Sequence, residues 1–227
     1  REGRTILKNS LDVVSTANVV KQSPVVLGGG GGDTPSEDKG IADVGTFMEF
    51  VRSVNAGAST SRWENADGEV CLLADIDLTG IKWTPIGSAT GVGSGAPTYE
   101  FSNAFTGKFN GKGHSITGIS WTCDMSKNNV YGLFGAADGA KISNLVIGAK
   151  GDAITLTGTP DITPSVAGVV GYAENTTIAN VTNNVSIILE GECPQAMPTS
   201  LAGIVGSGFN VTVGGKTKDN AVVNNGD

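Results

Sequence analysis

Residues 131–135 read YGLFG, residues 167–171 read AGVVG, and residues 202–206 read AGIVG. The copies lie 36 and then 35 residues apart, and each places two apolar residues between two glycines. Self-similarity at a period of about 20–50 residues is typical of repeat proteins. A unit of this length with short strands cannot bury its own apolar face, so successive units must stack on one another. The sequence therefore predicts a solenoid.

A second set of matches supports the repeat. Residues 142–145 (ISNL) match residues 178–181 (IANV) at an offset of 36. Residues 220–225 (NAVVNN) resemble the stretch that begins at residue 180 at an offset of 40, which implies a small insertion. Stacked asparagines can bond side chain to side chain between in-register strands. We therefore expect Asn144 and Asn180 to form a ladder at a turn.

The repeat also predicts which apolar side chains stack. Equivalent residues of successive coils should form columns in the interior. One column should contain Leu133, Val169 and Ile204, and the neighbouring column Phe134, Val170 and Val205.

The expected fold class is all-β, a right-handed parallel β-helix over residues 41–227 with an N-terminal capping α-helix. Residues 43–55 carry the helix signal, because Asp43 is a suitable N-cap and residues 47, 50, 51 and 54 share one apolar face. Such a helix would cover the open end of the first coil, which otherwise invites edge-to-edge association. Strands are expected at residues 69–73 and 116–121.

The N-terminal 40 residues differ from the rest. Residues 1–27 form a segment with apolar pairs and many valines, which favours strand. Residues 28–40 begin with five glycines and are expected to be a flexible linker. The segment has no core of its own, so we predict that residues 6–27 pair with a strand edge of a neighbouring subunit or partner protein. Packing on its own β-helix is the alternative.

The other end of the repeat has no evident cap, because the sequence stops within a repeat unit at Asp227. The chain is then either a fragment, or a protein whose last coil another subunit covers. Its start at Arg1 is typical of a mature or trimmed chain.

Composition narrows the classes of function. The chain carries 34 glycines among 227 residues, which suits many tight turns, and aromatics make up only 6%. A net charge of −7 argues against nucleic acid as a partner. No stretch of 18 apolar residues occurs, so no transmembrane helix is expected. No cofactor or metal is expected either.

Three cysteines, Cys71, Cys123 and Cys193, leave at least one unpaired. We interpret them as small buried apolar residues. One disulfide is the alternative.

Four blocks of the chain carry a family resemblance: LADIDL at 73–78, WTPIG at 83–87, FTGKFNGKGHSI at 105–116, and GLFG at 132–135 with its repeats. In this order they resemble the GLUG-motif β-helix proteins, which are secreted or attached to the outer membrane in gut Bacteroidales. The resemblance covers about residues 41–227. It implies an extracellular adhesin at the bacterial cell surface, and it supplies no catalytic residues. Residues 1–40 lie outside it.

Three aromatic residues are candidates for a ligand site: Trp63, Tyr99 and Trp121. Exposed aromatic rings often form platforms for sugars, and none of the three has an evident place in the core. The competing interpretation is that they cover the helix or the bases of loops. Trp83 belongs to a family block and is assigned a structural role.

Polar candidates point more weakly to a site. His114 is the single histidine and lacks the partners of a zinc site, so we interpret it as a turn residue. Asp75 and Asp77 lie two residues apart on one strand face, where carboxylates can bind calcium or act in acid–base chemistry. We favour the interpretation that they bond to turn amides. Glycosylation sequons occur at four asparagines, which we interpret as turn positions: Asn175, Asn180, Asn184 and Asn210.

Three functions remain in competition. The first is a non-catalytic adhesion module that binds a host glycan or matrix protein. The second is a structural subunit of a pilus or other surface assembly (a fimbrium), joined to a neighbouring subunit through residues 1–27. The third is a polysaccharide-degrading enzyme, which would need Asp75, Asp77 or Asp124 grouped with Lys or Arg on one exposed face.

Overall fold

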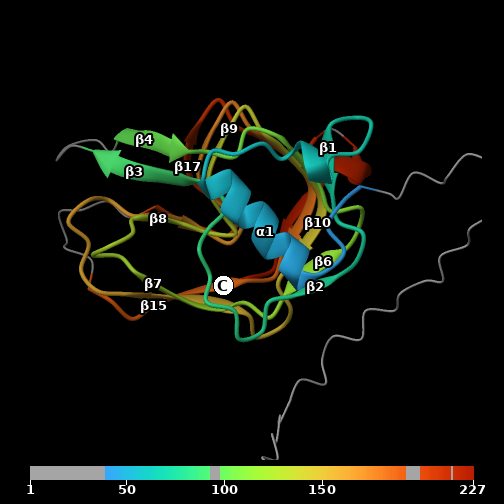
Figure 1. Ribbon diagram of the computed structural model, residues 1–227. Coiled ribbons are helices and arrows are strands. Elements are labelled where there is room, and N and C mark those ends of the chain that lie inside the picture. The colour runs from blue at the N-terminus through green and yellow to red at the C-terminus, as the bar shows by residue number, and fades with distance from the viewer. Residues whose placement is uncertain (1–38, 93–97, 193–199, 216) are drawn as a thin grey trace, which may run out of the picture. The chain divides into compact units, whose positions relative to one another are not determined.

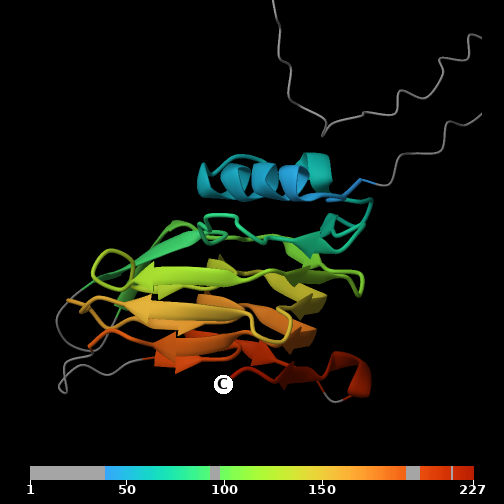
Figure 2. The same cartoon turned by 90° about the horizontal axis from the view of Figure 1, so that it is seen from below.

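The computed structural model describes residues 39–92, 98–192, 200–215 and 217–227. Within these residues the chain forms a parallel β-solenoid of about four turns, with one α-helix near its N-terminal end. Figure 2 shows the coils stacked one below another beneath the helix. The predicted strand segment 1–27 and residues 28–38 of the predicted linker lie outside the described residues.

Four parallel sheets run along the solenoid, one for each side or corner of the coil. The largest contains β1 (Glu69–Cys71), β2 (Ile76–Asp77), β5 (Lys108–Asn110), β6 (Ser115–Thr117), β10 (Lys141–Ile147), β14 (Thr177–Asn183), β18 (Thr212–Val213) and β19 (Val222–Asn224). The second contains β7 (Ser120–Asp124), β11 (Ala153–Thr157) and β15 (Ser186–Leu189). The third contains β8 (Val130–Tyr131), β12 (Ser165–Ala167) and β16 (Ser200–Ala202), and the fourth β9 (Phe134–Asp138), β13 (Val170–Glu174) and β17 (Val205–Phe209).

The register confirms the predicted core columns. Val170 of β13 pairs with Phe134 on one side and with Val205 on the other. The amide of Phe134 donates to the carbonyl of Val169, and the amide of Val170 donates to the carbonyl of Ile204. These columns are buried except in the last coil, where Ile204 and Val205 are only partly buried.

Asparagine ladders hold the corners, as predicted. The side-chain amide of Asn180 donates to Asn144 over 2.8 Å, and that of Asn144 donates to Asn110 over 3.0 Å. Asn144 and Asn180 have φ of 55° and 51°, in the left-handed region that asparagine tolerates better than most residues. A second ladder joins Asn210, Asn175 and Asp138.

The four sequon asparagines all lie in such ladders. Asn175, Asn180 and Asn210 donate through their side-chain nitrogens within the two ladders above. Asn184 donates to the carbonyl of Gly148 and accepts from Asn225. Their recurrence in the sequence therefore follows from the geometry of the corners.

The predicted insertion in the last coil is present, but its offset is 41 and not 40. β18 follows the ordinary repeat, with Thr212 paired to Thr177. β19 pairs Val222 with Val181, so six additional residues have entered between the two strands. The short 3₁₀ helix η2 (Lys218–Asn220) lies in this insertion.

The helix α1 (Val44–Asn55) caps the first coil as predicted. The Asp43 carboxylate accepts from the amide of Thr46 over 2.8 Å, which satisfies one free donor of the first turn. The buried face consists of Phe47, Phe50, Val51 and Val54. Figure 1 shows α1 lying across the end of the solenoid, with a further 3₁₀ turn, η1 (Ser61–Trp63), following it in the chain.

One antiparallel hairpin interrupts the solenoid. Ile86 bridges to Phe134, and Phe105 bridges to Ala137, so both contribute to the same sheet edge. Between them the chain leaves the coil as β3 (Ser88–Val92) and β4 (Thr98–Asn103), which pair only with each other. Figure 1 shows this hairpin beside the sheet that contains β9 and β17.

Candidate functional site

The three predicted aromatic site residues are buried, and the structure does not bring them together. Trp63 is 3% exposed, Tyr99 8% and Trp121 3%. A ring with so little exposed surface cannot serve as a platform for a sugar. The expectation of exposed aromatics is therefore corrected, and the competing interpretation applies to all three.

Each of these rings has a packing role. Trp63 contacts Phe50 of α1 edge-on, with ring centroids 5.6 Å apart. Trp121 stacks on Trp83 at 4.6 Å, and Trp83 in turn stacks on Phe47. This series of rings links the cap helix to the interior of the solenoid.

Tyr99 fixes the hairpin to the outside of the solenoid. Its ring lies 4.5 Å from that of Tyr172 on β13, and its hydroxyl donates to the carbonyl of Thr163 over 3.0 Å. Phe101 also packs on Tyr172, at 5.4 Å. The structural role predicted for Trp83 is confirmed, because it is buried and its indole N–H donates to the Gly132 carbonyl.

Both acidic candidates accept from backbone amides, Asp77 within a turn as favoured from the sequence and Asp75 from a strand residue of the next coil. Asp75 accepts from the amide of Ser115 over 2.7 Å and lies 3.3 Å from the His114 ring nitrogen. Asp77 accepts from the hydroxyl and the amide of Thr79. The hydrogen bond from the Ser115 amide is the main cause that lowers the pKa of Asp75. The hydrogen bond from the Thr79 hydroxyl is the main cause that lowers the pKa of Asp77. A carboxyl whose pKa is lowered is a poor proton donor at neutral pH.

Asp124 is also held in a turn. Its carboxylate accepts from the hydroxyl of Ser126 and pairs with Lys127 at 2.9 Å. These contacts, the Ser126 hydroxyl first, lower the pKa of Asp124 to about 2. Asp75 thus bonds to Ser115 and His114, Asp77 to Thr79, and Asp124 to Ser126 and Lys127, so the three carboxylates share no partner.

The described residues contain no group of three or more His, Cys, Asp or Glu side chains suited to a metal ion. Cys71 and Cys123 are both buried and free, and Cys193 lies outside the described part of the chain. Burial raises the pKa of both thiols, to about 12 for Cys123, so neither is a reactive thiolate. Among the described helices, none is long and apolar enough to cross a membrane.

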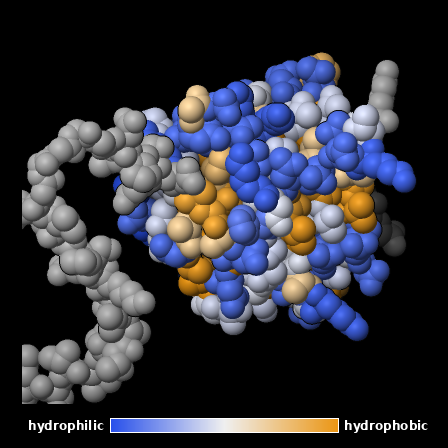
Figure 3. Space-filling view, turned by 90° about the vertical axis from the view of Figure 1, so that its right-hand side faces the viewer, coloured by the Kyte–Doolittle hydropathy of each residue, from blue (hydrophilic) through white to orange (hydrophobic). Residues whose placement is uncertain are grey.

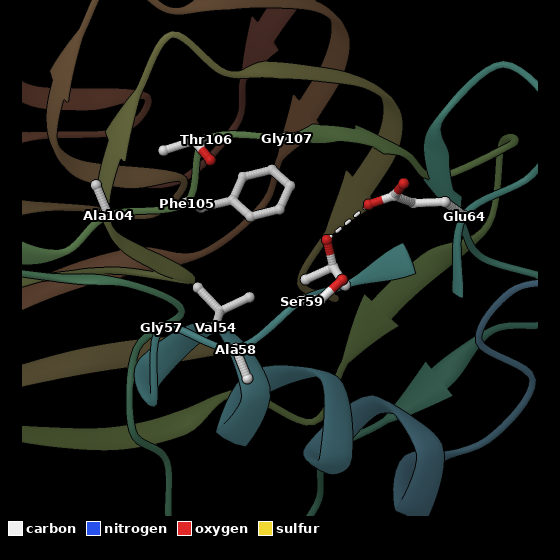
Figure 4. Close-up of a pocket in the computed structure, with 10 residues that line it drawn as sticks. Val54, Gly57, Ala58, Ser59, Glu64, Ala104, Phe105, Thr106 and Gly107 are labelled. Carbon is white, nitrogen blue, oxygen red and sulfur yellow. Dashed lines mark hydrogen bonds between the residues drawn. The ribbon is translucent and has the colours of Figure 1, made fainter. Parts of the chain in front are cut away.

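A hollow of about 300 Å³ lies where the cap helix meets the first coil. We call it the cap pocket, and Figure 4 shows it between the end of α1 and the segment that leads into β5. Its lining is Val54, Gly57, Ala58, Ser59, Thr60, Glu64, Ala104, Phe105, Thr106 and Gly107. This volume is at the lower end of the range of about 300–1,000 Å³ for small-molecule sites.

Three separate segments build the cap pocket. Gly57 ends the helix with φ of 66°, which turns the chain so that residues 58–60 line one wall. Glu64 follows η1 and accepts from the hydroxyl of Thr60 over 2.7 Å. The third segment, residues 104–107, is tied to the helix because the side chain of Asn103 donates to the carbonyl of Asn55.

The chemistry of the cap pocket is that of hydroxyl recognition. Ser59, Thr60 and Thr106 supply hydroxyls, and Glu64 supplies a carboxylate acceptor. Apolar side chains, including Val54 and Ala104, supply the rest of the wall. Of the ten residues that line the pocket, Glu64 is the single ionisable one.

Sequence reasoning missed this site. The polar run of small residues that follows the helix, GASTS at 57–61, is a signal that could have drawn attention to it. The contribution of residues 104–107 could not have been found in this way, because the hairpin separates them from the helix in the sequence.

Comparison of the chain with protein-family models, with curated proteins and with solved structures finds no match in any of the three.

Proposed function

We propose that this protein is a non-catalytic binding module that recognises hydroxyl-rich ligands, such as the terminal sugars of glycans, at the cap pocket. The observation that carries the proposal is the lining of that pocket. Hydroxyls and one carboxylate lie beside apolar side chains in a hollow large enough for a small ligand. A sugar presents the matching surface, with hydroxyls at its rim and C–H groups on its faces.

Charge limits the ligand further. No Lys, Arg or His is among the residues that line the cap pocket, and the whole chain carries a charge of −7. A sulfated or uronic sugar would meet Glu64 without a compensating cation. Neutral sugars therefore fit the pocket better than anionic ones.

Binding accounts for the pocket better than hydrolysis does. Glycoside hydrolysis ordinarily uses two carboxylic acids about 5–10 Å apart. The cap pocket offers one, Glu64. A place at the bacterial cell surface is part of the proposal and rests on the resemblance of residues 41–227 to GLUG-motif adhesins. The ligand would then be a host glycan, or a matrix protein that carries one.

The proposal is tested by screening the full chain against an array of neutral and anionic glycans and against matrix proteins. We expect binding to neutral glycans, and at least about tenfold weaker binding after Glu64→Ala, since charge-assisted hydrogen bonds contribute about 1.5–3 kcal/mol. Ala58→Phe should also weaken binding, because the larger side chain fills the exposed wall of the pocket.

Asp67→Ala is the matched control. Asp67 is an exposed carboxylate near Glu64 in the sequence that does not line the pocket, so its removal should leave affinity unchanged. Equal affinity of the Glu64→Ala, Ala58→Phe and Asp67→Ala variants would show that the ligand does not bind at the cap pocket. An array without a single bound glycan or matrix protein would refute the function.

A further inference from the structure

The end of the solenoid opposite α1 has strand edges that no described strand covers. β15, β16 and β17 are each the last strand of their sheet. In the final part of the chain, β18 and β19 pair with β14 and so cover its edge. The same part contacts β15 at one point, where the amide of Ile187 donates to the carbonyl of Asp227. We call the region of β15, β16 and β17 the open end. Figure 2 shows it at the far side of the stack from the helix.

The open end also exposes the apolar interior. Val166 and Val170 are fully buried, whereas Leu201 and Val205, which pair with them one coil later, are only partly buried. Phe209 at the end of β17 is 71% exposed. A hollow of about 180 Å³ lies at this end, lined by residues that include Ile187 and Leu201.

One side of the solenoid carries a mixed surface. Figure 3 views the side that carries β10, where hydrophilic side chains cover most of the surface and hydrophobic patches lie between them. Apolar patches of this kind are common on the surfaces of folded proteins. At the open end, strand edges without a described partner lie beside exposed apolar side chains. Another strand could pair with these edges and cover the apolar side chains.

Residues 6–27 of the chain are a matching occupant for the open end. This segment is 22 residues long, close to the 24 residues from Ser186 to Phe209 that it would have to follow. Its apolar pairs at residues 13–14, 19–20 and 25–26 could supply side chains to the exposed interior.

Charge favours the same pairing. Residues 1–32 contain four basic and two acidic residues, a net charge of +2. Because the whole chain carries −7, residues 33–227 carry −9. The segment and the solenoid are therefore opposite in sign, which favours encounter between them.

We propose that residues 6–27 of a second copy of this chain add to the open end as β-strand. The segment joins the solenoid at its capped end, where Ile41 bridges to Leu72 of the first coil. When it docks on the open end of another copy, the capped end of one copy faces the open end of the next. This head-to-tail contact does not close on itself, so it builds a linear assembly. Strand addition of this kind gains main-chain hydrogen bonds for affinity and side-chain pockets for specificity.

The test uses residues 1–227 as one chain. Light scattering should show oligomers whose mass grows with protein concentration. Leu201→Lys places a charge on the exposed interior of the open end and should reduce the mass to that of a monomer. Val19→Asp in the segment should do the same. Ser120→Lys, on the exposed outer face of β7, should leave assembly unchanged.

Cross-linking then identifies the contact. A carboxyl-to-amine coupling reagent applied to mixed ¹⁴N- and ¹⁵N-labelled protein should join Lys8 or Lys21 to Glu190 or Asp227 in mixed-isotope pairs. Circular dichroism of each variant verifies that the solenoid is folded. A monomer at all concentrations would overturn the proposal. So would assembly that survives Leu201→Lys and Val19→Asp in folded protein, or cross-links found only within single chains.

Discussion

Val170→Asp is expected to abolish folding. Val170 has no exposed surface and lies in a column between Phe134 and Val205, so the new carboxylate would be buried among apolar side chains without a partner. We expect a loss of about 5 kcal/mol or more, in the range reserved for buried unpaired charges. The total stability of a domain is about 5–15 kcal/mol, so little or no folded protein should remain.

Thr122→Asp is the matched control for this change. Thr122 lies on β7 with an exposed side chain, so the same carboxylate remains in water there. Chemical denaturation followed by circular dichroism should show an unfolding curve near that of the wild type for Thr122→Asp and no cooperative transition for Val170→Asp. If both variants unfolded like the wild type, Val170 could not be buried in an interior column between Phe134 and Val205.

Phe50→Ala should cause the second largest loss, about 3–5 kcal/mol, because truncation of a buried phenylalanine also leaves a cavity. Phe50 is fully buried, and its ring lies within 6 Å of three others: Trp63 at 5.6 Å, Phe109 at 5.8 Å and Phe105 at 5.9 Å. The change therefore weakens the contact between α1 and the first coil. It should also increase aggregation, since a loosened cap exposes strand edges.

Arg52→Ala serves as its control, because Arg52 is on the same helix with an exposed side chain. Urea unfolding should give a much lower midpoint for Phe50→Ala and a midpoint near the wild-type value for Arg52→Ala. Equal midpoints for the two variants would mean that the helix does not act as a cap.

The solenoid could be predicted because residues of the same type recur at the positions that pair between coils. An interior column accepts only apolar side chains, so Phe134, Val170 and Val205 had to recur at the coil period. The corner positions with left-handed φ favour asparagine, which is why Asn144 and Asn180 recur as well. The cap helix was predictable for a similar reason, since its buried face follows the helical period.

The hairpin was not predictable in this way, because it belongs to no repeat. β3 and β4 pair only with each other, and their aromatic contacts are with Tyr172, which lies on a later coil. Tyr99 therefore has no evident partner in the sequence, and its burial cannot be predicted from the repeat.

The other two aromatic candidates failed for a related reason. Trp121 is buried by Trp83, which lies far from it in the sequence. Trp63 is buried by Phe50, a contact that joins the helix to the loop after it. The cap pocket likewise combines residues 54–64 with residues 104–107. A single sequence shows periodicity well, but it does not show which irregular segments meet.

The register of the coils determines where the cap, the cap pocket and the open end lie. The most direct test is disulfide formation between Thr122→Cys and Thr155→Cys, in a chain whose Cys71, Cys123 and Cys193 are replaced by alanine. These threonines are paired across β7 and β11, and neighbouring strands lie about 4.8 Å apart, within the reach of a disulfide. Shifting the second cysteine to Thr157 moves it two residues along the strand, to more than about 7 Å, too far for a disulfide. We expect rapid oxidation of the 122–155 pair and none of the 122–157 pair, and the reverse result would show that the register is wrong.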